Sequence, residues 1–325
     1  MTTRRFLLAA FAAFGIAAAA PAQAENITVT HWGGQFYGAP YAVAMKKGFF
    51  KEQGVDVTGI LTAAGGGTAV RNTLAGGIPF GEVSLAAAVQ AMNAGQKLVI
   101  VAAGAQTVAD QMWIVKNGSP LKTIKDLAGK RISFTAPGSV SNMVLLMALK
   151  ANGMTAQDVK LVPAGDLGAN LSAVSSGAVD AGFSDEMVQS QNTNLVTPLF
   201  MVRDVMSPKM MQTVLITTSE FAKAKPEIVR GLIQARRMGL KYMADHPDES
   251  GEIVAAAYNN PNVALFQAEV KKLLALAYWS DGRLDYEGMN AMLEGLRITG
   301  QLKGDIDWAK YVDTAFLPQD LRASR

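Results

Sequence analysis

Short apolar runs alternate with amphipathic stretches over the first two thirds of the chain, which predicts strands followed by helices. The first unit comprises a strand at residues 27–31 and a helix at 40–47, whose proline suits the first turn. Because strand and helix alternate, we expect an α/β fold with mainly parallel sheets. The further strands are predicted at 55–61, 80–84, 98–103, 112–115, 132–135, 160–162, 179–184 and 212–217, and the helices between them at 68–75, 86–94, after 137–139, and at 169–175.

One segment of this pattern occurs twice. Residues 65–84 are echoed by 165–184: in each copy a glycine-led loop opens a short helix, a glycine closes it, and an apolar strand ends on a serine. Two copies predict two lobes that face each other across a cleft, where the ends of parallel strands bind ligands. The alternative is chance matching in a chain rich in Ala and Gly.

The last third of the chain predicts helices only. A long helix begins at Pro226 and stops ahead of His246-Pro247. Further helices are predicted at 263–278, 286–298 and 308–316, and we expect them to pack on the first lobe. The chain would leave the first lobe after residues 98–103 and return to it at strand 212–217. These two connections between the lobes, called crossings below, would form a hinge.

The N-terminus has the pattern of an export signal. Arg4 and Arg5 precede an apolar run at 6–20 and a small-residue cleavage site, so we expect a signal peptide at 1–24 that is cleaved after Ala24. The Sec and Tat routes both remain open. The mature protein is therefore expected in the periplasm.

Composition narrows the possible functions. The chain has no Cys, which excludes disulfides, thiolate metal sites, cysteine nucleophiles and a lipid-anchored N-terminal Cys, so the protein is not expected to be a lipoprotein. With only two His, a zinc site is not expected either, and neither is a cofactor. Removal of Arg4 and Arg5 lowers the formal net charge from +3 to +1, which leaves no basic field for nucleic acid.

Several stretches resemble one family. KGFFKEQGVDV at 47–57 is similar to the G-[LF]-F-x-x-x-G-[LV]-x-V stretch of nitrate, taurine and sulfonate-type (NMT1/THI5-like) periplasmic binding proteins. KDLAGKRI at 125–132 resembles that family's entry to its second lobe, and GAVDA at 177–181 resembles its G-x-[IV]-D-A motif. Residues 225–235 resemble the helix after its return crossing.

The resemblance implies a type II periplasmic binding protein fold. Lobe 1 would comprise 25–106 and 216–325, lobe 2 would comprise 107–215, and two hinge strands would join them. A trapped small-molecule ligand would pass to a membrane ABC permease with a cytoplasmic ATPase, and a monomer is expected. After the final cleft strand the family often has Glu-Pro, whereas this chain has Glu186 followed by Met187. The identity of the ligand therefore cannot be inferred from the family.

Helix N-termini are candidate sites for an oxygen-rich head group, because their backbone N–H groups are unpaired. The alternative for each hydroxyl is ordinary N-capping. The candidates are Gly67 and Thr68 in one lobe and Ser139, Ser141 and Asn142 in the other.

Strand ends supply a second set of candidates. Ser84 and Ser184 end matching strands, which would bring both hydroxyls to the cleft, and the alternative is that they are ordinary turn serines. The first strand-helix loop gathers several aromatics that could stack on a flat ligand, or instead pin a surface loop to the core. These loop candidates are Trp32, Gln35, Phe36 and Tyr37, and His31 beside them is expected to be satisfied locally.

Carboxylates bear on ligand charge. Asp185 and Glu186 at a strand end would suit an amine or a protonated heterocycle, or Glu186 could cap a helix or brace the hinge. Asp110 and Gln111 are weaker candidates of the same kind. No Arg lies in the predicted cleft loops, and Arg71 is interpreted as part of a solvated helix face.

The favoured function is a binding module that closes on a small solute and catalyses nothing. The alternatives are an enzyme on the same fold, of pyrimidine or menaquinone-pathway type, and a sensor subunit that presents ligand to a receptor. Among ligands we expect small organic acids or sulfonates first, nitrogenous or aromatic heterocycles second, and nitrate-like anions third. A Gly-x-Ser-x-Gly elbow and a His cluster are both missing from the sequence.

Overall fold

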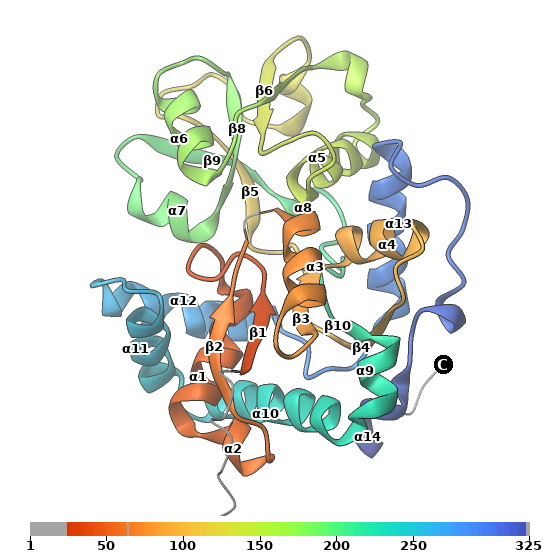
Figure 1. Cartoon of the computed structure of the whole chain (residues 1–325). Coiled ribbons are helices and arrows are strands. Elements are labelled where there is room, and N and C mark those ends of the chain that lie inside the picture. Colours follow the sequence, from red (N-terminus) through yellow and green to blue (C-terminus); the bar gives the residue numbers. More distant parts are fainter. Residues whose placement is uncertain (1–24, 64, 323–325) are drawn as a thin grey trace, which may run out of the picture.

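The computed structural model describes residues 25–63 and 65–322, so the expected signal peptide lies outside the described residues. The chain builds two five-stranded sheets, one above the other in Figure 1, in the orders β2-β1-β3-β10-β4 and β7-β6-β8-β5-β9. The first sheet comprises β1 (Glu25–Val29), β2 (Val57–Leu61), β3 (Phe80–Ser84), β4 (Leu98–Ala103) and β10 (Thr213–Thr218), and the second comprises β5 (Gln111–Lys116), β6 (Arg131–Phe134), β7 (Lys160–Pro163), β8 (Ala181–Asp185) and β9 (Val196–Met201).

Each sheet with its covering helices is called a lobe below, the first lobe carrying β1. In both sheets the three strands of the strand-helix units pair in parallel, as the alternating pattern predicts. The strands that follow a crossing, β5 and β10, pair antiparallel with both neighbours, so each sheet is mixed. This is the α/β two-lobe architecture expected from the sequence.

The repeated segment forms the same unit in both lobes. In the first lobe α3 (Gly66–Ala75) leads into β3, and in the second α6 (Leu167–Ser175) leads into β8. Both strands occupy the middle of their sheet. The repeat in the sequence is therefore a structural repeat, and chance similarity does not account for it.

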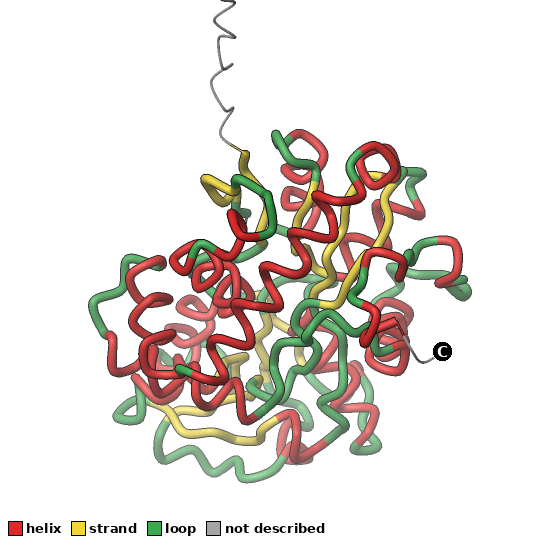
Figure 2. Tube along the Cα trace, turned by 90° about the horizontal axis from the view of Figure 1, so that it is seen from below, coloured by secondary structure: helices red, strands yellow, loops and turns green. Residues whose placement is uncertain are grey.

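Helices cover both faces of the first sheet (Figure 2). Val214 and Ile216 of β10 pack in one apolar cluster with α4, whereas Leu215 packs in another cluster with α10, which is the period of a strand buried on both sides. The helices of this lobe are α1 (Ala39–Lys47), α2 (Phe49–Glu52), α3, α4 (Leu85–Asn93), α9 (Ser219–Ala224), α10 (Pro226–Asp245), α11 (Pro247–Ala257), α12 (Val263–Ala275) and α14 (Gln319–Arg322).

Helix α13 (Tyr286–Ile298) contacts both lobes. It packs on α4 of the first lobe, as expected, and also on α5 of the second, where Gly295 lies against the side chain of Met143. The absence of a side chain at Gly295 allows this close approach. The remaining helices of the second lobe are α5 (Val140–Ala151), α6, α7 (Glu186–Gln191) and α8 (Val202–Val205).

The sequence-based prediction of elements is wrong at residues 308–316 and misses strand β9 and several helices, α2, α7, α8, α9 and α11. Residues 308–316 form two short 3-10 turns, η4 (Trp308–Lys310) and η5 (Thr314–Phe316), because Asp307 and Asp313 each cap a separate turn. Strand β9 was not predicted, since Pro198 interrupts its pattern, but β9 lies at a sheet edge, where proline is tolerated.

One buried ion pair joins the long helix to the first sheet. Arg236 of α10 donates to Glu82 of β3, and the side chains of both residues are buried. Arg236 lies on the same face as Leu232 and Gly239, which are buried too. Within the described part of the chain, none of the helices has the length and apolar character needed to cross a membrane.

Candidate ligand-binding site

A cavity lies between the two lobes, at the ends of the strands. The space in it that is large enough for a water molecule amounts to about 20 Å³, and all of its empty space, open solvent at the mouth included, amounts to about 410 Å³. Its walls come from the β1–α1 loop and α12 of the first lobe, from β8 and α7 of the second lobe, and from both crossings. The described residues that line it are Gly34, Gln35, Phe36, Asp110, Gln111, Phe183, Asp185, Met187, Gln212, Glu269, Leu273 and Tyr278.

Aromatic rings form part of the wall. Phe36 and Phe183 approach from opposite lobes, and Tyr278 follows α12. Behind the wall, Tyr37 stacks on Tyr278 with ring centroids 6.1 Å apart and an interplanar angle of 9°. Tyr37 also donates from its hydroxyl to Oε1 of Gln212, at 2.9 Å, which ties the first strand-helix loop to the second crossing.

Three carboxylates share the cavity: Asp110, Asp185 and Glu269. Burial, and then repulsion from Asp185, raises the pKa of Asp110 to about 8. The same two causes raise the pKa of Glu269 to about 7. Burial raises the pKa of Asp185 as well, although its Oδ1 accepts a hydrogen bond from the backbone N–H of Val188 at 2.8 Å. The site is therefore rich in acceptors that resist ionisation.

Glu186 follows Asp185 and has two cationic partners. It forms ion pairs with Arg203 of α8, in its own lobe, and with Lys272 of α12, in the first lobe. The Glu186 side chain is only 5% exposed, and the pair with Lys272 spans the two lobes. Glu186 therefore acts as a contact between the lobes beside the cavity.

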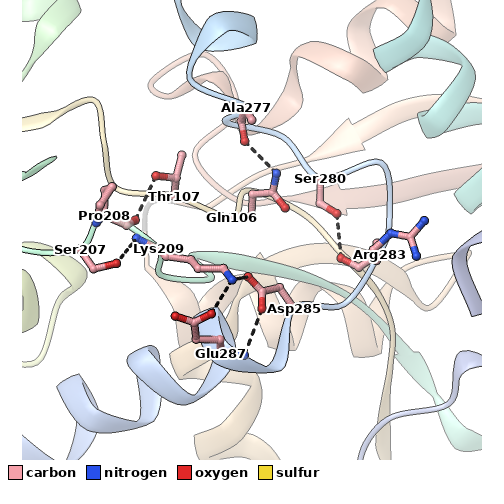
Figure 3. Close-up of polar contacts among 10 residues, drawn as sticks. All are labelled: Gln106, Thr107, Ser207, Pro208, Lys209, Ala277, Ser280, Arg283, Asp285 and Glu287. Carbon is pink, nitrogen blue, oxygen red and sulfur yellow. Dashed lines mark hydrogen bonds and ion pairs between the residues drawn. The ribbon is translucent and has the colours of Figure 1, made fainter. Parts of the chain in front are cut away.

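The two crossings run side by side at residues 106–107 and 207–209, as Figure 3 shows. Thr107 donates from Oγ1 to the carbonyl of Pro208, at 3.0 Å, so that one crossing holds the other. Gln106 donates from Nε2 to the carbonyl of Ala277 at 2.9 Å, and Lys209 pairs with Asp285 and Glu287 on the other side. The segment between α12 and α13 thus flanks both crossings.

The structure places the candidates at helix N-termini away from the cavity wall. Thr68 and Gly67 lie exposed in the first turn of α3, and Thr68 Oγ1 accepts a hydrogen bond from Arg71 at 2.7 Å. Ser139 caps α5, while Ser141 Oγ accepts from the N–H of Thr135 at 3.0 Å. Asn142 Oδ1 accepts from the N–H of Gly138 at 3.0 Å, so this loop is braced internally.

The two serines at strand ends do not line this cavity. Ser84 caps α4 by accepting from the N–H of Ala87 at 3.2 Å, and Ser184 is fully buried beside β5. In the aromatic loop, Gln35 and Phe36 line the cavity, Tyr37 lies behind it, and Trp32 packs against Tyr258 with centroids 5.2 Å apart.

His31, Asp110, Gln111 and Asp185 were the remaining sequence candidates near this region. Asp110, Gln111 and Asp185 come together because the ladder between β5 and β8 places Gln111 opposite Asp185. His31 packs edge-on against Tyr37, and burial lowers the pKa of its imidazole.

Sequence reasoning missed the residues that α12 and the second crossing contribute. The signal for Glu269 was present: it interrupts an apolar helical face formed by Phe266, Val270 and Leu273, where a carboxylate is unusual. Gln212 was placed at the start of a strand but not assigned to the site. Among the described residues, no group of three or more His, Cys, Asp and Glu side chains is arranged to hold a metal ion.

Two sheets of the same strand order, joined by two crossings and separated by a cavity, define a type II periplasmic binding protein fold. The NMT1/THI5-like family profile matches residues 35–250, so the chain belongs to this family. The resemblance stated from the sequence is thereby confirmed.

Individual relatives are distant. The riboflavin-binding protein RibY of Chloroflexus aurantiacus is 22% identical over 311 residues, which cover 86% of this chain and 82% of that protein. The periplasmic aliphatic sulphonate binding protein SsuA of Escherichia coli superposes with a TM-score of 0.72 at 16% identity, over 88% of this chain and 91% of its own. The desulfurization enzyme DSZB superposes with a TM-score of 0.64 at 17% identity, over 90% of this chain and 97% of its own.

Proposed function

We propose that this protein is the extracytoplasmic substrate-binding component of an ABC importer and captures a small organic solute by closure of its lobes. The observation that carries the proposal is the cavity, because its wall combines residues of both lobes with residues of both crossings. A solute held there contacts both lobes at once, so binding favours the closed arrangement. The relatives named as binding proteins support this class of function.

The positions of the two crossings define the two bodies that would move relative to each other. Residues 25–106 with 216–325 form one body in this proposal, residues 107–215 form the other, and the paired crossings are the hinge. The signal peptide at 1–24 is cleaved after Ala24, and the mature monomer works in the periplasm. Its partners are a membrane permease and the cytoplasmic ATPase of that permease.

The cavity wall bears on the ligand class. An organic acid or a sulfonate needs cationic or N–H donors, and no Lys or Arg is among the described residues that line the cavity. A nitrogenous or aromatic heterocycle needs acceptors and flat apolar faces, which the carboxylates and the three rings supply. The wall therefore supports the heterocycle class over the acids and sulfonates.

An enzyme remains the competing class, because DSZB has the same fold. The described lining of the cavity contains no Ser, Thr, Cys, Lys or His. Asp110 and Glu269, whose pKa values are raised toward neutrality, are the groups there that an enzyme would use as a general base, so a turnover assay is needed to separate binding from catalysis.

A solute panel tests the proposal. The mature protein is screened by thermal shift against heterocycles, amines, carboxylates and sulfonates, and one class is expected to raise the melting temperature. Cells that lack the gene are then assayed for uptake of the solute that binds. Loss of uptake in those cells is expected, whereas conversion of the bound solute by purified protein would overturn the importer function.

A further inference from the structure

The charges around the cavity are not balanced. Within the described part of the chain, Asp110, Asp185 and Glu269 form no ion pair with Lys, Arg or His, although all three line the cavity. Arg203 and Lys272 both pair with Glu186, and Lys272 also interacts electrostatically with Asp110 and Asp185 without forming an ion pair with either. Three acidic side chains thus face one space without a cation of their own.

A neutral side chain gives an independent indication of a ligand. Gln111 lines the cavity with only 6% of its surface exposed, and its Oε1 is buried without a hydrogen-bond partner. Its Nε2 donates to Oε1 of Gln212, at 3.1 Å, which fixes the amide and leaves Oε1 as a pure acceptor. Oδ1 of the neighbouring Asp110 is buried and unpartnered as well. Such orphaned acceptors are costly unless a donor reaches them.

The backbone brings these acceptors together. Gln111 is opposite Asp185 in the ladder of β5 and β8, and Glu186 N–H donates to the carbonyl of Asp110 at 3.1 Å. Glu269 approaches from α12 in the other lobe. A single group placed among them meets acceptors from the crossing, from the second lobe and from the first lobe.

We infer that the solute carries a protonated nitrogen, of the amine, amidinium or protonated-heterocycle type, held between Asp110 and Asp185 with Gln111 Oε1 as a further acceptor. This inference rests on the proposed function and specifies its ligand. The rings of Phe36, Phe183 and Tyr278 hold the flat or apolar part of the same molecule. A cation supplies both the charge and the N–H donors that this group of acceptors lacks.

Binding of a cation also displaces protons. Asp110 and Glu269, whose pKa values are raised to about 8 and about 7, are partly protonated near neutral pH. A bound cation favours their ionised forms, so affinity rises with pH by up to about tenfold per unit for each proton released. The charged and titratable groups packed around Asp110 are Asp185, Glu186, Arg203, Glu269, Lys272, Tyr37 and Tyr278.

Three probes that share a benzene ring and differ in charge test whether the site binds a cation or an anion: benzamidine, benzoate and benzenesulfonate. Isothermal calorimetry and thermal shift on the mature protein are expected to show binding of benzamidine and no binding of the two anions. Affinity for benzamidine, which stays protonated throughout, should increase from pH 6 to pH 8.5. The heat should differ between buffers of different ionisation enthalpy, as proton release requires.

Variants assign the binding to this cavity. Asp110→Asn and Glu269→Gln keep shape and remove charge, and Asp110→Asn is expected to weaken benzamidine at least tenfold and to flatten the pH dependence. Asp245→Asn is the control, because Asp245 is exposed and pairs only with Lys241 one turn away. Circular dichroism verifies that each variant is folded.

Failure of benzamidine to bind, or equal affinity in Asp110→Asn, overturns the inference. Preferred binding and uptake of benzoate or another anion overturns it too, while the importer function then stands. Turnover of a bound solute instead counts against the importer function, so the two failures are distinguishable.

Discussion

Arg236 donates from Nε to Oε2 of Glu82 at 2.9 Å, and the side chains of both are almost completely buried, at 1% and 0% exposure. Two further atoms of the pair are engaged: Thr213 donates to Oε1 of Glu82 at 2.6 Å, and Arg236 Nη1 donates to the carbonyl of Ser280 at 2.8 Å, whereas Arg236 Nη2 is buried without a hydrogen-bond partner. Four segments, around Glu82, Thr213, Arg236 and Ser280, therefore meet at one charge pair in the first lobe.

Removal of one partner should be strongly destabilising. In Glu82→Ala, Arg236 is left as a buried charge without its counter-ion, and we expect a loss of about 3–5 kcal/mol in the free energy of unfolding. Urea unfolding followed by circular dichroism measures it. Arg237→Ala is the matched control, since Arg237 pairs with Asp320 at the surface, and its loss should be below about 1 kcal/mol. Equal effects of the two variants would contradict this assignment.

Loss of Lys272 should weaken ligand capture more than folding. Lys272→Ala removes the partner of Glu186 that comes from the other lobe and leaves Arg203 in place. We expect solute affinity to fall roughly fivefold, or about 1 kcal/mol, because the closed arrangement loses a contact. Calorimetry with a solute that binds gives the value. The adjacent Lys271→Ala is the control, since Lys271 pairs with Asp248 within the first lobe, and unchanged affinity is expected there.

Stability should fall as the pH rises through neutrality. Asp110 and Glu269 have pKa values of about 8 and about 7 in the folded protein, against 3.8 and 4.5 as ordinary values. Between about pH 4 and pH 8 the folded state therefore binds more protons than the unfolded state, so the free energy of unfolding decreases with rising pH. Melting temperatures at pH 5 to 8.5 measure this slope without added solute. Asp110→Asn should make the slope shallower, and an unchanged slope would refute the contribution of Asp110.

Close packing of α10 on α1 should not tolerate a methyl group at Gly239. A Cβ there would overlap with the backbone carbonyl oxygen of Pro40, and it would lie 3.1 Å from the carbonyl carbon of Pro40 and 3.3 Å from the Cβ of Ala44. Gly239→Ala is expected to destabilise the protein by about 1–3 kcal/mol, as overpacking does, measured by urea unfolding. Gly168→Ala in the first turn of α6 meets only the side chain of Asp166 at 3.5 Å. This control should be neutral or slightly stabilising.

The fold could be predicted from the sequence because the features that indicate strands, helices and turns lie within short segments. Periodicity defined β3 and β4 to the residue, and the glycines of the repeat marked the equivalent units α3–β3 and α6–β8. Prediction failed where tertiary context decides. Pro198 is acceptable in β9 only because that strand is at an edge, and Arg236 is buried only because Glu82 is there to meet it.

The cavity was only partly accessible, for a different reason. Gln35, Phe36 and Asp110 lie in loops that follow strands, where ligand sites are expected from the chain order. Glu269 and Tyr278 come from a helical region far along the sequence, and only the packing of α12 on α11 and of α11 on α1 brings them to the strand ends. No spacing in the sequence encodes that placement.

The two ion pairs of Glu186 affect how readily the protein releases a bound solute. In the opening that the proposed function requires, Lys272 would pass into water, while Arg203, on the same lobe as Glu186, would stay with the carboxylate. Opening therefore never strands an uncompensated anion in the protein interior, and the electrostatic barrier to release stays low.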